Sequence, residues 1–175
     1  MAMTKPNQTP VSARWWILFL LWFCVLAVAF LIFGFSEQGG EESTATSDRV
    51  VRVIITITHP EFETLSKAQQ LDIWSFLSFI VRKSAHFIEY AALGFFVRLL
   101  MASYSLRRGA LWAWLGGTLF AASDELHQLF TAGRSGAWQD VALDSSGVFF
   151  GALAAAAFMW VYRHISRRRS SVNTP

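Results

Sequence analysis

The chain has 175 residues, of which 54% are hydrophobic and 15% are charged, with 16 Phe and 8 Trp. This composition is too apolar for a soluble domain of this size and predicts an integral membrane protein. The net charge is +3, and the basic residues form no stripe interleaved with aromatic residues, which argues against nucleic-acid binding. The single cysteine, Cys24, excludes an intrachain disulfide.

The first predicted membrane span covers residues 15–35, which carry no charge and follow a polar tail at residues 1–14. About 20 apolar residues suffice for a helix to cross a bilayer core. A cleaved signal peptide is the competing interpretation, because residues 27–29 (Ala-Val-Ala) have the small-x-small form of a cleavage site. The apolar run continues through residues 30–33, where a mature N-terminus should turn polar, so a retained helix is favoured.

Residues 36–83 form the one long hydrophilic segment. Residues 36–48 are rich in Gly, Ser, Thr and Glu, a composition typical of a loop. Residues 50–58 are mostly β-branched and predict a short strand or an interfacial segment. A helical pattern follows over residues 64–79, and we expect it to lie along the membrane surface and to lead into the second span.

Three further spans are predicted at residues 84–102, 110–130 and 141–162, followed by a basic tail at residues 163–175. The predicted fold class is therefore an all-α integral membrane protein. It is a four-transmembrane-helix bundle, with one extracytoplasmic loop that contains short helical or interfacial elements. Residues 15–162 form a single membrane domain.

The distribution of charge predicts the orientation of the bundle. All twelve Asp and Glu residues lie in or beside two connections, 36–83 and the loop before the last span. The tails and the remaining turn carry bases without acids: Lys5, Arg14, Arg107, Arg108, Arg163, Arg167, Arg168 and Arg169. Because cytoplasmic loops collect Lys and Arg, we expect both termini to be cytoplasmic and the 36–83 loop to be extracytoplasmic.

The second span keeps ionisable residues inside an apolar segment. Lys83, His86, Glu89 and Tyr90 recur at helical spacing and form one stripe near its outer end. Ionisable side chains in a membrane segment are costly, so they are interpreted first as functional.

The third and fourth spans place polar residues at the same depth. Asp124, His127 and Gln128 share one face of the third span, whereas the neighbouring Glu125 should face the outer loop or the lipid headgroups. Asp140 lies in the first turn of the fourth span, where it could also simply stabilise the helix N-terminus.

We expect these groups to meet in a recess that opens to the exterior, beneath a loop that carries Arg134. Asp144 lies deeper than Asp140 on the same face, and Gly147 and Gly151 continue that face and would let a neighbouring helix approach closely. A polar network that merely joins the helices is the structural alternative, although it explains one or two such residues better than a cluster.

Several blocks of residues point to a known family. They are Arg82-Lys83-x-Ala85-His86-Phe87-x-Glu89-Tyr90-x-x-Leu93-Gly94, Ser123-Asp124-Glu125-x-His127-Gln128-x-Phe130, Gly133-Arg134-Ser135-Gly136 and Asp140-Val141-x-x-Asp144-x-x-Gly147. In this order, over residues 70–160, they resemble the VanZ-like family of small bacterial membrane proteins, named after a teicoplanin-resistance determinant. The resemblance implies a four-helix, multi-pass protein of the bacterial plasma membrane with a link to the cell envelope or to glycopeptide tolerance. It supplies no catalytic mechanism.

The first functional hypothesis is a non-enzymatic protein that binds an anionic lipid headgroup or a lipid-linked envelope precursor. Arg82, Lys83 and Arg134 would hold the phosphate, since Arg offers a forked pair of donors and Lys a point charge. The complete predicted binding set is Arg82, Lys83, Tyr90, Gln128, Arg134, Asp140 and Asp144. The residues do not indicate the oligomeric state.

The second hypothesis is a membrane hydrolase or transferase that acts on a lipid phosphate. His86 or His127 would serve as base or nucleophile, and Glu89 or Asp124 would fix the imidazole tautomer. The sequence leaves open whether there is catalysis.

The third hypothesis is a divalent metal held by His86, Glu89, Asp124, His127 and Asp144. Two imidazoles with carboxylates suit zinc or manganese, yet no compact ligand motif such as H-E-x-x-H is present. We therefore predict no cofactor and keep the metal as an alternative.

Overall fold

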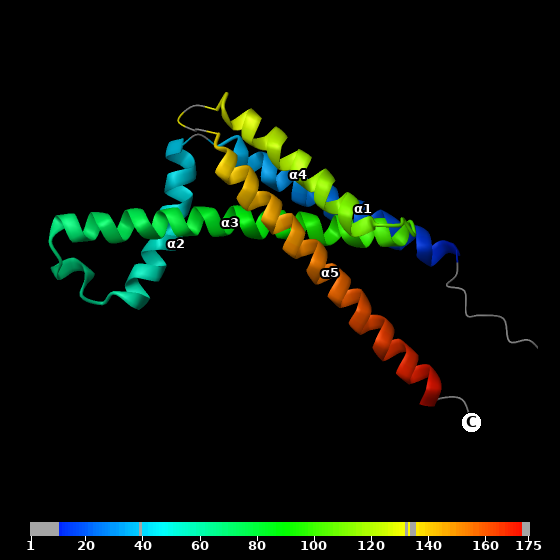
Figure 1. Cartoon of the computed structure of the whole chain (residues 1–175). Helices are drawn as coiled ribbons and strands as arrows, with labels where there is room; N and C mark the ends of the chain where they lie inside the picture. The colour runs from blue at the N-terminus through cyan, green and yellow to red at the C-terminus, as the bar shows by residue number, and fades with distance from the viewer. Residues whose placement is uncertain (1–10, 39, 132, 134–135, 173–175) are drawn as a thin grey trace, which may run out of the picture.

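The computed structural model describes residues 11–172 except 39, 132 and 134–135, and this part of the chain contains helices and no strand. The elements are α1 (Val11–Ser36), α2 (Gly40–Thr58), a short 3-10 helix η1 (Phe62–Thr64), α3 (Lys67–Ser103), α4 (Gly109–Gln128) and α5 (Trp138–Val172), shown in Figure 1. The predicted all-α class is confirmed for the described residues.

Three helices are long and apolar enough to cross a membrane: Arg14–Ser36, Lys67–Ser103 and Trp138–Arg168. They contain the first, second and fourth predicted spans. Among the described helices α4 does not reach this threshold, so the expected count of four is corrected to three. The reason lies in the last turns of α4, where Asp124, Glu125, His127 and Gln128 lower the hydropathy of an otherwise apolar helix.

The segment that was predicted as a loop followed by a short strand or an interfacial segment is largely the helix α2. Val51 and Ile55, four residues apart, are 0% and 5% exposed, so the β-branched run has a helical period that packing exploits. Thr56 and Thr58 donate their hydroxyl hydrogens to carbonyl oxygens four residues earlier, as threonine does inside helices. Tertiary packing thus overrides the local preference for strand.

Helix α3 begins well before the predicted start of the second span at residue 84. A capping box between Ser66 and Gln69 starts it, and it continues for 37 residues. At about 1.5 Å per residue it measures roughly 55 Å, which exceeds a bilayer core of about 30 Å. Its N-terminal part extends beyond the other long helices, and α2 lies across it (Figure 1). The helical pattern predicted over residues 64–79 is thus largely part of the same helix as the span.

Aromatic and charged side chains fasten α2 to α3. The Trp74 indole N–H donates to Asp48 Oδ1 over 3.0 Å, and the Arg52 guanidinium lies 5.7 Å from the centroid of the Trp74 ring. A cation over an indole face is attracted by the ring quadrupole. These contacts hold α2 as one wall of the site described below.

Glycines set the close crossing of α3 and α5. A Cβ atom at Gly147 would lie 2.6 Å from the Phe87 carbonyl oxygen, and one at Gly151 would collide with the Ala91 carbonyl oxygen. On the other helix, a Cβ atom at Gly94 would collide with the backbone of Val148. The prediction that Gly147 and Gly151 permit a close helix contact is confirmed, and α3 is the neighbour.

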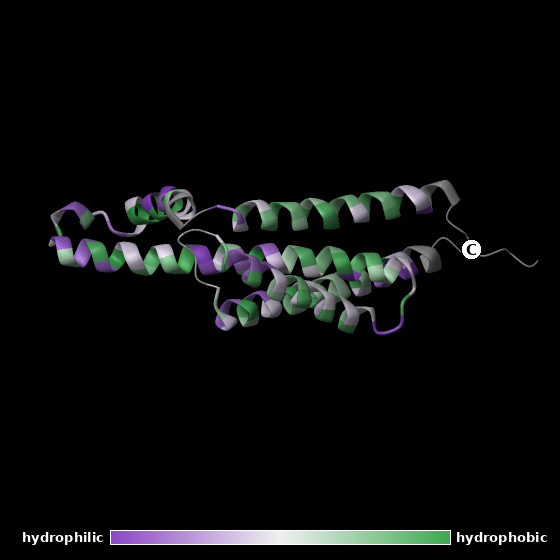
Figure 2. Cartoon of the chain, turned by 90° about the horizontal axis from the view of Figure 1, so that it is seen from above, coloured by the Kyte–Doolittle hydropathy of each residue, from purple (hydrophilic) through white to green (hydrophobic). Residues whose placement is uncertain are grey.

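The helices alternate in direction, as Figures 1 and 2 show together. The start of α1, the turn between α3 and α4 and the end of α5 lie toward one end of the molecule. Helix α2 and the connection from α4 to α5 lie toward the other end. All four long helices contribute to one buried cluster, formed by Ile32, Tyr90, Leu93, Ala121 and Val148. One of its members, Tyr90, also belongs to the polar network described below.

Candidate functional site

A buried polar network joins α3 to α4. The Tyr90 side chain is fully buried, and its hydroxyl donates to Asp124 Oδ2 over 3.1 Å. The Gln128 amide donates to the same oxygen over 3.3 Å. These side chains are completely or almost completely excluded from solvent, so each hydrogen bond replaces one that solvent would otherwise provide. Three of the predicted residues therefore meet as a hydrogen-bonded unit inside the bundle.

A second pair joins α3 to α5. His86 Nδ1 lies 3.7 Å from Asp144 Oδ1, and the Asp144 side chain is 0% exposed. Neither carboxylate oxygen of Asp144 accepts a hydrogen bond from the described residues. A buried carboxylate favours a proton or a positive charge close by, and the His86 imidazole is placed to supply it. This partner differs from Glu89 and Asp124, the carboxylates expected to orient a histidine.

Lys83 forms an ion pair with Asp140 at the start of α5. Both side chains are partly exposed, and the ammonium also lies 5.6 Å from the centroid of the Phe79 ring. The positive charge predicted to hold phosphate is thus already matched by a carboxylate. Asp140 has a partner on another helix in addition to its position near the α5 N-terminus.

His127 faces α1 and not the buried Asp124. Its Nε2 lies 2.6 Å from Glu37 Oε1, and its ring stacks on Phe33 with a centroid distance of 5.2 Å. The expectation that Asp124 would fix its tautomer is therefore wrong. The pair is 36% and 54% exposed, so it contributes on the order of 1 kcal/mol or less to stability.

Glu125 is 4% exposed, and its Oε2 accepts a hydrogen bond over 3.0 Å from the backbone N–H of Ala137. The prediction that it contacts the connection between α4 and α5 is confirmed. Lipid headgroups were the alternative to this contact, and the hydrogen bond from Ala137 favours the connection. Arg134, expected above the recess, lies outside the described residues, and its role stays a prediction.

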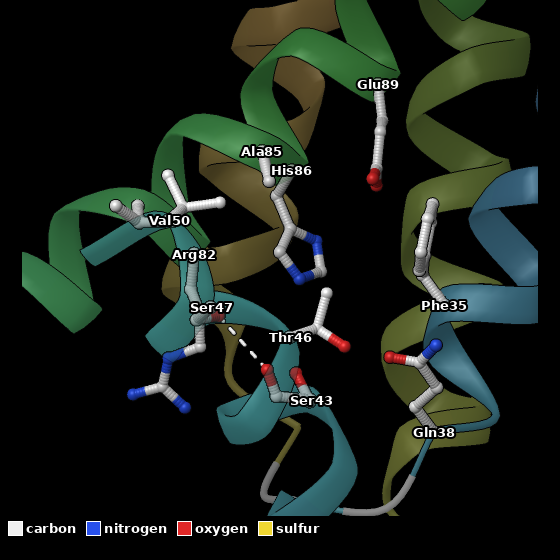
Figure 3. A pocket seen from close by; sticks show the side chains of 11 residues that line it. Phe35, Gln38, Ser43, Thr46, Ser47, Val50, Arg82, Ala85, His86 and Glu89 are labelled. Atoms are coloured by element: carbon white, nitrogen blue, oxygen red, sulfur yellow. Dashed lines mark hydrogen bonds between the residues drawn. The ribbon is translucent and has the colours of Figure 1, made fainter. Parts of the chain in front are cut away.

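A pocket of about 160 Å³ lies between the end of α1, the helix α2 and the middle of α3 (Figure 3). By the same measure a single water needs only about 10–15 Å³, so a small chemical group fits. His86 and Glu89 extend into the space from α3, and Phe35 and Gln38 line the side formed by the end of α1. The lining residues are Phe35, Gln38, Ser43, Thr46, Ser47, Val50, Val81, Arg82, Ala85, His86 and Glu89.

The sequence analysis did not predict that α2 forms one wall of this pocket. Ser43, Thr46, Ser47 and Val50 lie at helical spacing of three, four and seven residues, which places them on one face. That spacing could have signalled the wall, but the Gly, Ser, Thr and Glu content of the segment indicated a loop. Glu37 was missed for another reason, because its partner His127 is 90 residues away in the sequence.

Arg82 supplies the permanent positive charge among the described lining residues of the pocket. It lies four residues before His86 on α3, and both residues line the pocket. In Figure 3 the Arg82 guanidinium extends past Ser47, away from the His86 ring. One guanidinium and one imidazole beside serine and threonine hydroxyls make a set of donors suited to phosphate oxygens.

The metal hypothesis finds no geometric support in the described part of the chain. There, no three His, Cys, Asp or Glu side chains are grouped closely enough to hold an ion together. The five candidate ligands are instead divided: His86 pairs with Asp144, His127 pairs with Glu37, and Asp124 accepts from Tyr90 and Gln128, while Glu89 lines the pocket.

Comparison with known proteins gives one family and no individual relative. Neither a curated protein nor a solved structure matches the chain. The model of the VanZ/LLP1 family matches residues 18–160, which is most of the chain and covers all of α3 and α4 and most of α1 and α5. With the blocks of residues in α3, α4 and α5 that first suggested it, this match confirms the resemblance, and the chain belongs to the VanZ/LLP1 family.

Proposed function

We propose that this VanZ-like protein is a multi-pass membrane protein that binds the phosphate of a lipid headgroup, or of a lipid-linked envelope precursor, in the pocket between α1, α2 and α3. The observation that carries the proposal is the position of Arg82 and His86 on the wall of that pocket. Through such a precursor the protein would contribute to glycopeptide tolerance, the trait for which the family is named.

The exposed side chains support a location in the membrane. Trp16 and Phe30 on α1 are 71% and 76% exposed, and large apolar side chains also cover the free faces of α3 and α5. Lipid tails would remove this surface from water, as they do for membrane helices. Under the proposed topology, the end with the basic tails is cytoplasmic and the pocket is extracytoplasmic, which agrees with the distribution of Lys and Arg.

In this topology α4 is a fourth crossing that buries one face against α3 and α5 and exposes large apolar side chains such as Leu119 and Leu126 on the other. Its 20 residues rise about 30 Å, enough to cross the hydrocarbon core. Ala113, Gly117, Ala121, Asp124 and Gln128 form one buried stripe along it. Because its buried acid and amide face protein, their low hydropathy does not prevent insertion.

The pocket offers each part of a phospholipid headgroup a chemically matched contact. A guanidinium binds phosphate through charge-assisted hydrogen bonds, which are stronger than neutral ones. The His86 imidazole and the hydroxyls of Ser43 and Thr46 add donors, while Phe35 and Val50 provide apolar surface for the first carbon atoms of the lipid.

The test is binding of dihexanoyl phosphatidic acid, a short-chain lipid phosphate, to the purified full-length protein in detergent. Arg82→Gln should weaken binding about tenfold or more, because a hydrogen bond to a charged group contributes roughly 1.5–3 kcal/mol. Arg107→Gln is the matched control, since Arg107 lies in the turn at the opposite end of the molecule. Equal affinity of Arg82→Gln and the natural protein would contradict the proposal.

A second candidate function, a hydrolase or transferase acting on the bound phosphate, is favoured by the His86–Asp144 pair. A buried carboxylate beside an imidazole that reaches into a pocket is the arrangement of an oriented general base. Asp144→Asn should then lower the rate of phosphate release from the same lipid at least tenfold with little change in lipid affinity. If no release is detected from the natural protein, the pocket binds without catalysis.

A further inference from the structure

We infer that the end of the bundle that carries the basic tails holds a second anion site, which binds the phosphate of a net-anionic lipid. The site is formed by Arg98 on α3, Arg163 on α5 and the first turn of α4. It lies at the opposite end of the molecule from the pocket between α1, α2 and α3 (Figure 1). It therefore goes beyond the function proposed for that pocket and does not depend on it.

Arg98 is a half-buried cation that the chain does not match with a carboxylate. Its Nε atom is buried, and no acceptor among the described residues lies within hydrogen-bond distance of it. The nearest acid on α3 is Glu89, nine residues earlier, which places it about 13.5 Å away along the axis and on the opposite face. Because a buried charge is costly unless it is paired and hydrogen-bonded, this position favours an anion close by.

A second guanidinium approaches the first. The charge of Arg163 is close enough to that of Arg98 for the two to repel each other. They follow the contact between the Phe95 and Phe158 rings, whose centroids are 6.1 Å apart, so the repulsion acts where α3 and α5 still lie close together. An anion between the two guanidinium groups replaces this repulsion with two attractions. Phosphate is suited to that position, because its oxygens match the forked donors of arginine.

The first turn of α4 contributes further donors to the same place. A Cβ atom at Gly109, the first residue of α4, would lie 3.4 Å from Arg98 Nη1, so the guanidinium lies against the start of this helix. The N-cap residue, Arg108, makes no capping hydrogen bond with its side chain. A cation is unfavourable beside the positive end of a helix dipole, whereas an anion is favourable there. An anion that contacts both the guanidinium and the free N–H groups removes this conflict.

The depth of the site favours a lipid headgroup as the source of the phosphate. Arg98 lies five residues, or about 7.5 Å, before the end of α3. Trp112 on α4 and Trp160 on α5, each within one turn of the site, are 56% and 68% exposed, and exposed tryptophans gather at the level of the headgroups. All twelve acids lie in or beside the connections at the other end, so none is placed here to accept a choline or ethanolamine ammonium. A net-anionic headgroup should therefore bind more tightly than a zwitterionic one.

The experiment measures binding of dihexanoyl phosphatidylglycerol to the purified full chain in detergent by native mass spectrometry, with dihexanoyl phosphatidylcholine as the zwitterionic comparison. All variants are made in the Arg82→Gln protein, so that binding in the pocket between α1, α2 and α3 does not enter. Arg98→Gln should weaken binding of phosphatidylglycerol about tenfold or more, since it removes charge-assisted hydrogen bonds. Arg98→Lys should recover only part of the affinity, because lysine keeps the charge but loses the fork. Arg163→Gln, at an exposed position where the fold tolerates the change, should weaken binding to a similar extent.

Arg14→Gln is the matched control. It removes the same charge at the same end of the molecule, but Arg14 lies on α1, where it lines a separate pocket with Ser103 and Ser105. We expect this variant to bind phosphatidylglycerol as tightly as the protein from which it is made. Equal losses in Arg14→Gln and Arg98→Gln would contradict the site, because general attraction to the basic end would then explain the binding. Unchanged binding in Arg163→Gln, or equal affinity for the two lipids, would also contradict it.

The outcomes keep this inference separate from the proposed function. The proposed function is judged by the difference between Arg82→Gln and the natural protein, and the second site by the differences among variants that all carry Arg82→Gln. Inorganic phosphate distinguishes the two sources of the group. Displacement of phosphatidylglycerol by phosphate at equal concentration assigns the site to free phosphate, and continued binding of the lipid assigns it to the lipid headgroup.

Discussion

Replacing Gly151 with leucine should force α5 away from α3 and lower the free energy of unfolding by about 3 kcal/mol or more. Even the first carbon of a side chain at this position would collide with the backbone carbonyl of Ala91. Backbone atoms of a helix cannot move aside individually, so the two helices would have to separate along their contact. The polar pairs between α3 and α5, His86 with Asp144 and Lys83 with Asp140, depend on the same contact.

Gly116→Leu is the matched control for this prediction. A Cβ atom at Gly116 would meet no atom within 4 Å, so the same substitution adds a side chain in open space. Unfolding of both variants in detergent, followed by helical circular dichroism against denaturant, gives the comparison. If Gly151→Leu is as stable as Gly116→Leu, α5 does not cross α3 as closely as described.

Replacing Asp124 with alanine should lower the free energy of unfolding by about 3 kcal/mol. The substitution removes the common acceptor of the Tyr90 hydroxyl and the Gln128 amide, both of which are buried. A buried donor that loses its partner costs about 1–3 kcal/mol, and two donors are affected. Ser123→Ala is the neighbouring control, because its exposed hydroxyl donates to the Phe120 carbonyl oxygen on the preceding turn of the same helix.

A double substitution tests whether the interaction itself is responsible. Tyr90→Phe should destabilise the natural protein but cost much less in the Asp124→Ala variant, because the hydroxyl there has already lost its acceptor. The same denaturant titration provides all four free energies. Strictly additive losses would mean that Tyr90 and Asp124 do not interact across α3 and α4.

The substitutions at Gly151 and Asp124 test the contacts between helices, whereas the substitution Arg82→Gln tests the pocket. Tyr90, Asp124 and Gln128 are buried between α3 and α4, where they stabilise the helix contact. Arg82, His86 and Glu89 line a pocket on the side of α3 that faces α2. Although the sequence places all of them in one layer, the structure therefore divides them into a stabilising group and a candidate binding group.

Local patterns in the sequence were sufficient for most of the helices and for the faces that carry the polar residues. Apolar runs located α1 and α5 to within a few residues at their starts, because the burial of apolar side chains does not depend on which neighbour covers them. Glycine spacing identified the close contact at Gly147 and Gly151 for the same reason: the absence of a side chain is a local property.

What only the tertiary structure decided is which side chains become partners. Helical spacing puts His127 near Asp124, but the crossing of α1 and α4 turns it toward Glu37. The polar composition of residues 40–48 is typical of a loop, but packing against α3, through contacts such as Trp74 with Asp48, stabilises a helix there and creates the pocket. Partner choice depends on the angles and offsets between helices, and these are set by contacts between residues far apart in the chain.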